Sequence, residues 1–224
     1  IMTTEAGTGA APVGQWIGSR PSGLEIFAVM FAGVAGIMIA GLQPLLLETL
    51  GHEGKLTPNQ LGQAGAAELL TLGLAAFLAG ALLKTERLKV IASVTALILA
   101  GLDAATPFFE GDAITLIRAT AGVPSGVLMW VAIAMIARTP TPERWSGIYL
   151  TVQTLAQFLL ATVLSLTVVP VYGAGGGWVA MGAFCVVTAA VSLFVPDRMA
   201  SLPRTEGHSS LPGIRGWIAL VSAF

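Results

Sequence analysis

The sequence predicts an all-α polytopic membrane protein, a bundle of six transmembrane helices followed by the start of a seventh. Composition gives the first indication: 55% of the 224 residues are hydrophobic and only 10% are charged, whereas soluble domains carry about 25% charged residues. The second indication is a series of apolar runs near the roughly 20 residues that a helix needs to cross the hydrocarbon core. The six complete runs are 24–47, 61–83, 88–108, 114–137, 147–170 and 178–196.

Basic residues predict the orientation of these helices. Nine of the 11 Lys and Arg residues fall in the N-terminal segment or in the loops after the second, fourth and sixth runs, and the opposite loops hold only Lys55. Because cytoplasmic loops collect Lys and Arg, we expect a protein of the cell membrane with a cytoplasmic N-terminus. The alternation also supports six spans, since a missed span would scramble it. The balance of 11 basic and 12 acidic residues argues against nucleic acid as a partner.

The N-terminal segment and the first span differ in composition. Residues 1–23 are rich in Gly, Ala and Thr and lack the regions of a signal peptide, so they predict a flexible cytoplasmic tail with Trp16 at the interface. In the first span, Ala32, Gly36 and Ala40 recur at every fourth position. Such small residues predict close contact with a neighbouring helix.

Three helix starts carry capping signals. Thr57, Pro58 and Gln60 predict an N-cap, a proline at the first helical position and a capping box for the second helix. Thr141 has the same relation to the fifth helix, and Asp112 is the expected cap of the fourth.

The last two spans are bounded by aromatic residues. Trp145 and Trp178 stand where a membrane–water aromatic belt is expected. The polar segment 197–215 then predicts a cytoplasmic loop that joins two halves. The apolar run 216–224 reaches only about 14 Å, less than half the hydrocarbon core. We therefore expect the chain to be a fragment of a longer protein.

Three ionisable residues lie inside the spans, where each is a functional candidate because burial in a bilayer is costly. Arg118 and Asp103 lie at similar depths, about 8 Å and 7 Å from the outer end of their helices, so they are expected to pair across neighbouring helices or to snorkel to the interface. Glu68 lies deeper, at about 10 to 15 Å. It is a candidate proton carrier, or a protonated residue that packs against a neighbouring helix.

Uncharged polar residues mark the first and fifth spans. Gln153 and Gln157 are four positions apart and share one helix face. They would line a wet cavity or hydrogen-bond to a neighbouring helix, which is the commoner use of such residues. Gln43, followed by Pro44, is similar.

Enzyme and cofactor signatures are missing from the sequence. The two histidines, His52 and His208, fall in loops on opposite sides, so no buried Ser–His pair is available. The single cysteine, Cys185, excludes a cysteine-based metal site, and no Walker A sequence is present. We expect no enzymatic activity, no cofactor and no metal.

Two motifs resemble the major facilitator superfamily of transporters. After the second span the family shows Gly-x-Leu-x-Asp-Arg-x-Gly-Arg-Lys. Here Gly80, Leu82 and Lys89 match it, whereas Lys84 replaces the acidic residue and Arg87 the second glycine. In the fourth span the family often shows Arg-x-x-x-Gly, which Arg118 and Gly122 fit. The fifth span departs from proton-driven drug exporters, because it lacks Gly-Pro-x-x-Gly-Gly.

This resemblance implies two six-helix bundles that rock about a midplane site. It implies Gln43, Arg118 and Ser125 as cavity residues, Glu68 or Asp103 as the titrating group, and a small organic solute and protons as partners besides the bilayer and a second half. The alternative is a six-span scaffold or an intramembrane enzyme. Reading the coding sequence past residue 224 separates the two.

Overall fold

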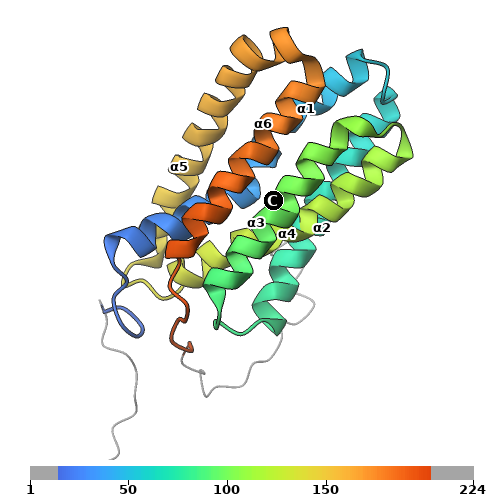
Figure 1. Cartoon of the computed structure of the whole chain (residues 1–224). Helices are drawn as coiled ribbons and strands as arrows, with labels where there is room; N and C mark the ends of the chain where they lie inside the picture. Colours follow the sequence, from blue (N-terminus) through green and yellow to red (C-terminus); the bar gives the residue numbers. More distant parts are fainter. Residues whose placement is uncertain (1–14, 203–224) are drawn as a thin grey trace, which may run out of the picture. The chain divides into compact units, whose positions relative to one another are not determined.

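The computed structural model describes residues 15–202, and this part of the chain is built of helices without a β-strand (Figure 1). The helices are α1 (Gly23–His52), α2 (Pro58–Leu82), α3 (Leu88–Ala105), η1 (Thr106–Phe108), α4 (Asp112–Ile136), α5 (Pro142–Val163), η2 (Leu164–Val168), α6 (Val169–Val191) and η3 (Ser192–Phe194). The all-α prediction is therefore confirmed for these residues. The expected tail to residue 14, the loop from 203 and the seventh span at 216–224 lie outside them.

Five helical stretches are long and apolar enough to cross a membrane: Gly23–His52, Pro58–Leu82, Leu88–Phe108, Asp112–Ile136 and Pro142–Phe194. The last has 53 residues and would extend about 80 Å if it were straight. Figure 1 shows instead that α5 and α6 form the two legs of a hairpin. The chain reverses between 170 and 178 as expected, but not through a loop, because the backbone there leaves helical geometry only at Gly173.

The reversal at Gly173 needs a glycine and is held by an acidic side chain. Gly173 has φ 63° and ψ −159°, a conformation that side chains with a Cβ avoid. Glu53, directly after α1, accepts a hydrogen bond from the backbone N–H of Ala174 at 2.7 Å. The end of α1 therefore supports the start of the second leg of the hairpin.

Only one of the three expected helix caps is confirmed. Thr57 and Gln60 form the complete capping box of α2. Thr141 occupies the N-cap position of α5, but its side chain makes no capping hydrogen bond. The cap position of α4 is held by Gly111, and Asp112 is already helical. The Asp112 carboxylate instead accepts a hydrogen bond from Gln60 Nε2 at 2.8 Å, so it ties α4 to α2.

This difference between two threonines gives a matched prediction. Thr57→Ala is expected to cost about 1 kcal/mol of unfolding free energy, because it removes the oxygen that caps α2. Thr141→Ala is expected to cost clearly less, because its side chain makes no such bond. Denaturant unfolding in detergent micelles measures both. Equal losses at the two positions would contradict the capping assignment.

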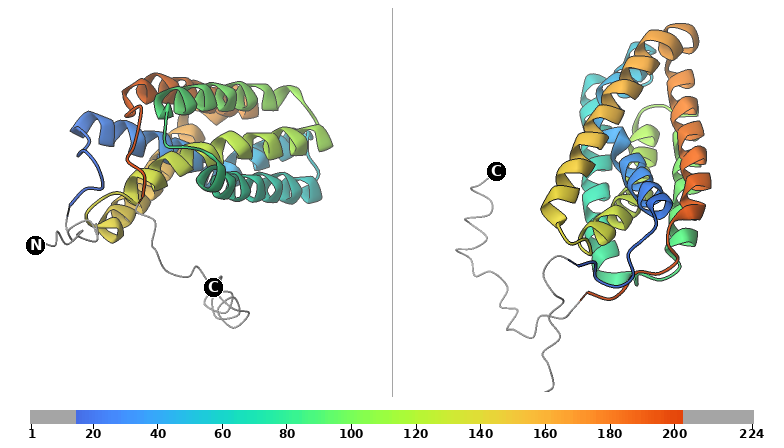
Figure 2. Two further views of the ribbon diagram at one scale, coloured as in Figure 1. Left: turned by 90° about the horizontal axis from the view of Figure 1, so that it is seen from below. Right: turned by 90° about the vertical axis from the view of Figure 1, so that its left-hand side faces the viewer.

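The helices form three layers, with α1 and α4 between α3–α6 and α2–α5 (Figure 2). Glycines permit the closest approaches. A Cβ on Gly126 would meet Ala76 N of α2 at 2.8 Å, and one on Gly36 would meet Leu128 Cβ of α4 at 2.8 Å. The small residues of α1 and α4 thus set close helix contacts, as the spacing of Ala32, Gly36 and Ala40 predicted for the first span.

The helix contacts follow an internal symmetry. Suppose that α1, α2 and α3 change places with α4, α5 and α6 in that order. The contact between α2 and α4 then becomes the contact between α5 and α1, and the contact between α3 and α4 becomes that between α6 and α1. The α1–α4 and α3–α6 contacts map onto themselves. Since α1 and α4 begin at opposite ends of the bundle (Figure 1), the two triplets share this order of main contacts in opposite orientations.

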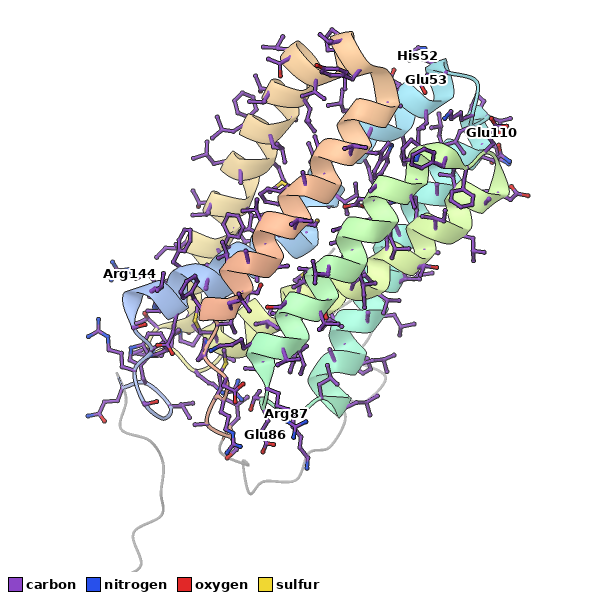
Figure 3. The ribbon with its side chains drawn as sticks, viewed as in Figure 1. His52, Glu53, Glu86, Arg87, Glu110 and Arg144 are labelled. Atoms are coloured by element: carbon purple, nitrogen blue, oxygen red, sulfur yellow. The ribbon has the colours of Figure 1, made fainter. Side chains whose placement is uncertain are left out.

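Most of the charged residues collect at the two ends of the bundle. Figure 3 places Arg87 and Arg144 at one end, and His52, Glu53 and Glu110 at the other. We call the first the basic end. Its described basic residues lie in the N-terminal segment, in the loops after α2 and α4, in the first turns of α3 and α5 and in the segment after η3: Arg20, Lys84, Arg87, Lys89, Arg138, Arg144 and Arg198.

The segment before α1 packs against the bundle. Trp16 lies edge-to-face with Trp145 of α5, with ring centroids 6.2 Å apart. The backbone N–H of Ile17 donates to the carbonyl of Arg138 at 3.0 Å. The last residues of the expected flexible tail, from 15 onward, are therefore fastened to the basic end.

Candidate functional site

Three charged side chains from three helices meet inside the bundle. Glu68 comes from α2, Asp103 from α3 and Arg118 from α4, and at most 1% of each residue is exposed. Arg118 lies about two turns from the start of its helix, nearer to the end opposite the basic end. We call these three residues the ionic cluster.

Arg118 bridges the two carboxylates. Its Nη1 lies 2.8 Å from Asp103 Oδ1, so the pair that their matched depths predicted is confirmed and the snorkelling alternative is wrong. Its Nε donates to Glu68 Oε2 at 3.1 Å, and its Nη2 contacts Glu68 Oε1. The sequence did not predict that Glu68 pairs with Arg118, because depth estimates do not show which way a helix face is turned.

Further polar side chains complete the hydrogen bonding of the ionic cluster. Gln43 of α1 donates through Nε2 to Glu68 Oε2 at 3.0 Å and to the carbonyl of Gly65 at 3.3 Å. Thr106 Oγ1 accepts a second bond from Arg118 Nη1 at 3.1 Å. Gln43 is thus brought to the site as expected, whereas Thr106 was missed. A buried threonine beside an in-span aspartate is the signal that would have indicated it.

Helix α6 closes the site with an aromatic ring and a thiol. The guanidinium carbon of Arg118 lies 4.4 Å from the ring centroid of Trp178, within range of a cation–π interaction. Cys185 Sγ donates a weak hydrogen bond to Asp103 Oδ2 at 3.6 Å. Trp178 is fully buried, so its expected place in an aromatic belt is wrong. The packing of α6 on α3 and α1 turns this residue inward.

The ionic cluster is electrically unbalanced when both carboxyl groups are ionised, because two negative charges then face one guanidinium. A buried net charge is unfavourable in low dielectric, so the closed arrangement is balanced when one carboxyl holds a proton. The partners of the two groups differ. Both oxygens of Glu68 accept bonds from Arg118, but within residues 15–202 Asp103 Oδ2 has only the Cys185 thiol. The geometry therefore favours Asp103 as the protonated group.

The other expected pathway residues lie outside the ionic cluster. Ser125 is on α4, about 10 Å along the helix from Arg118, and its buried Oγ has no hydrogen-bond partner among the described residues. Gln157 donates through Nε2 to the carbonyl of Ile37 at 2.8 Å, so it binds a neighbouring helix, the commoner of the two uses considered. The Oε1 atom of Gln153 is buried and has no hydrogen-bond partner in the described part of the chain.

The loop after α2, whose resemblance to the transporter motif implies a gating role, lies at the basic end, far along α2 from the ionic cluster. Its named residues are Gly80, Leu82, Lys84, Arg87 and Lys89. Within residues 15–202 the three basic members form no salt bridge. The loop is instead held by backbone bonds, from Met199 N to the Thr85 carbonyl and from Leu88 N to the Asp197 carbonyl, each 3.0 Å long.

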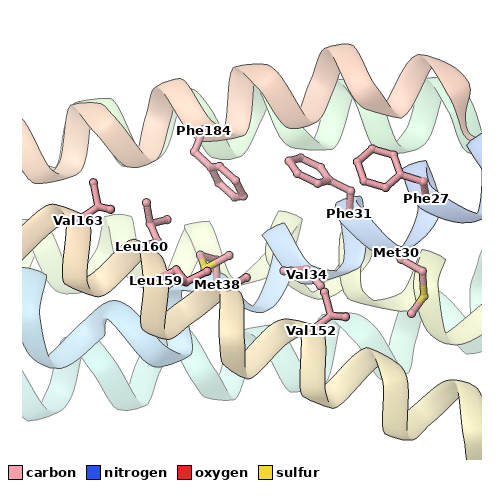
Figure 4. A pocket seen from close by; sticks show the side chains of 11 residues that line it. Phe27, Met30, Phe31, Val34, Met38, Val152, Leu159, Leu160, Val163 and Phe184 are labelled. Carbon is pink, nitrogen blue, oxygen red and sulfur yellow. The ribbon is translucent and has the colours of Figure 1, made fainter.

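A separate apolar pocket of about 450 Å³ opens between α1, α5 and α6 (Figure 4). Only apolar side chains line it: Phe27, Met30, Phe31, Val34, Met38, Val152, Ala156, Leu159, Leu160, Val163 and Phe184. It exists because α5 packs loosely, with Tyr149 as its one buried residue. The pocket offers no charged or hydrogen-bonding side chain, so it suits an apolar group.

In the described part of the chain, no group of three or more His, Cys, Asp and Glu side chains is placed to hold a metal ion. Comparisons with known protein families, with curated proteins and with solved structures find no match to this chain. The function must therefore be argued from the geometry of the bundle and its buried charges.

Proposed function

We propose that this bundle is one half of a secondary active transporter of the cell membrane, with six spans and a cytoplasmic N-terminus. It would move a small organic solute by alternating access, coupled most simply to protons. The basic end would face the cytoplasm, as expected for membrane proteins. The proposal assigns the chain no enzymatic activity and no cofactor.

The symmetry of the helix contacts supports this architecture. Inverted repeats of three helices, nested within each six-helix half, are a feature of major facilitator transporters, which place their solute site near the bilayer midplane between two halves. The main contacts made by helices α1, α2 and α3 and by helices α4, α5 and α6 follow such an inverted pattern. The sequence motifs around Gly80 and Arg118 point to the same family. A second bundle would complete the pathway.

The buried ionic cluster is the observation that carries the proposal. In the closed arrangement it is balanced with a proton on Asp103, whereas a state that admits water tolerates the ionised form, because water solvates the net negative charge. Binding and release of one proton would therefore favour different conformations of the bundle. That difference is what coupling to a proton gradient requires.

The apolar pocket supports an expectation about the solute. Its walls hold no charged or hydrogen-bonding side chain, so a bound sugar or inorganic ion would lose its hydration without compensation. We infer that the solute carries an apolar part that fits this pocket between α1, α5 and α6.

A six-span scaffold is the second candidate, and one observation favours it. The ionic cluster is sealed, and Nε, Nη1 and Nη2 of Arg118 all contact acceptors. Such a network also serves to hold α2, α3 and α4 in register. Measurement of transport separates this candidate from the proposed function.

The test uses the full-length protein in proteoliposomes, with solutes chosen from a panel of small apolar and amphipathic compounds. Wild type is expected to accumulate a solute when a pH gradient is imposed. Asp103→Asn is expected to abolish gradient-driven accumulation but to retain exchange of the solute, because the amide imitates the protonated carboxyl and cannot release a proton. Asp112→Asn, exposed at the same end of the bundle, is the matched control and should accumulate solute normally.

Two outcomes count against the proposal. Wild-type protein that moves no solute across the panel favours the scaffold. Unchanged accumulation by Asp103→Asn removes this residue from coupling. Glu68→Gln then tests the other carboxyl in the same assay.

A further inference from the structure

A second pocket, of about 200 Å³ and lined by polar residues, lies at the basic end of the bundle. It is formed by the segment before α1, the end of α4 and residues 196–200. Three arginines line it, namely Arg20, Arg138 and Arg198, together with two acidic residues, Glu25 and Asp197. The pocket is separate from the ionic cluster, and the proposed transport mechanism does not use it.

Arg138 supplies a buried positive charge to this pocket. The residue is 6% exposed. Its Nε donates to the carbonyl of Ala200 at 2.6 Å, and its Nη1 donates to the carbonyl of Ala134. Among residues 15–202 no carboxylate lies within 4.0 Å of its guanidinium. Among the same residues, 15–202, Arg138 Nη2 has no hydrogen-bond partner.

The carbonyl groups do not balance this charge. The end of a helix supplies about half a negative charge, whereas buried ions in proteins are normally paired with a full counter-charge. Burial alone lowers the pKa of Arg138, so an anion beside the guanidinium would stabilise its charged form. The position therefore favours a bound anion.

The two acidic residues do not fill this role. The Glu25 carboxylate accepts the backbone N–H of Ser22 at 2.7 Å and forms the capping box of α1. Neither Glu25 nor Asp197 forms an ion pair with a described arginine. Three guanidinium groups against two carboxylates leave the pocket with a net positive charge.

We propose that this pocket binds a phosphate group, with Arg138 as its buried anchor and Arg20 and Arg198 at its exposed rim. Guanidinium groups match phosphate oxygens in charge and in hydrogen-bond geometry. Trp16 lines the same pocket and contacts Trp145, and tryptophans of membrane proteins concentrate at the level of the headgroups. Basic pockets on the cytoplasmic side bind anionic lipid headgroups. The inference needs the membrane orientation proposed above but not transport.

The test measures the thermal unfolding midpoint of the full-length protein in detergent. Three ligands are titrated at constant ionic strength: dioctanoyl phosphatidylglycerol, dioctanoyl phosphatidylcholine and inorganic phosphate. A saturable rise with phosphatidylglycerol, larger than with phosphatidylcholine, is expected and identifies a lipid headgroup as the source of the phosphate. A saturable rise with inorganic phosphate alone supports the site with a soluble phosphate as its ligand. No saturable rise with any of the three overturns the proposal.

Variants locate the effect in the pocket. Arg138→Gln is expected to weaken phosphatidylglycerol binding about tenfold or more, because charge-assisted hydrogen bonds to the phosphate are lost. Arg144→Gln makes the same charge change at an exposed residue of the same end that does not line the pocket. It should bind within about twofold of wild type, because exposed charges contribute little. Folded Arg138→Gln protein that binds like wild type overturns the proposal.

A second variant keeps the test decisive if Arg138→Gln does not fold. The double substitution Arg20→Gln and Arg198→Gln changes only exposed side chains of the pocket, so the bundle should fold normally. It is expected to weaken binding severalfold through the loss of two rim charges. Unchanged affinity in this variant counts against a phosphate site here.

Discussion

Replacement of Arg118 by methionine is expected to cost about 3–5 kcal/mol of unfolding free energy. The substitution keeps much of the side-chain volume but removes the charge that joins Glu68 and Asp103. Two carboxyl groups would then remain buried without a partner, and the ring of Trp178 would lose its cation. The penalty comes from these stranded groups rather than from the lost ion pair itself.

A charge-free cluster provides the control for this prediction. Arg118→Met combined with Glu68→Gln and Asp103→Asn should recover most of the lost stability, because replacing every member of a buried ionic group is often close to neutral. The exposed Arg144→Met should change stability by no more than about 0.5 kcal/mol. Denaturant unfolding in micelles measures all three. A single Arg118→Met variant as stable as wild type would show that the ionic cluster does not hold the bundle together.

The second large effect is expected at the contact of α2 with α4. Gly126→Val should cost about 1–3 kcal/mol or more, because overpacking forces a shift of the neighbouring backbone. A Cβ at this position would lie 2.8 Å from Ala76 N and 2.9 Å from Ala75 Cβ. The obstacle includes main-chain atoms, so a change of rotamer cannot relieve it.

Gly73→Val is the matched control for this substitution. Gly73 lies on α2, and a Cβ there would meet nothing within 4 Å. The same change in volume and backbone freedom should therefore leave stability nearly unchanged, and only Gly126→Val should lower the thermal midpoint. Equal losses at the two glycines would show that intrinsic helix preference, and not helix contact, sets the cost.

The sequence predicted the features that depend on one helix at a time. The apolar runs indicated the helices because length and composition decide whether a segment can cross a bilayer. The capping box at Thr57 was correct because its partners lie within three residues. The break before Trp178 was placed correctly but predicted too long, since the turn needs only the positive φ of Gly173. Several glycines in one segment do not show which of them reverses the chain.

The candidate site depended on more than one helix, and the sequence predicted it only in part. Asp103 and Arg118 were matched because they lie on consecutive helices at similar depth, so a short connection restricts where they can meet. Cys185 gave no signal of its own, because a cysteine is an ordinary residue in an apolar helix, and Thr106 gave only its place near Asp103 in the sequence. Their role arises from lying within hydrogen-bond reach of Arg118 and Asp103.

The sequence by itself determined that this protein is helical and apolar, that basic residues collect at one end, and that three charges lie within apolar segments. Only the tertiary structure decided that these charges share one cluster, that Gln43 joins it, and that Trp178 faces inward. The physical reason is rotational: hydropathy shows how deep a residue lies along a helix. The direction in which it points depends on how each helix is turned by close packing at Gly36, Gly122 and Gly126.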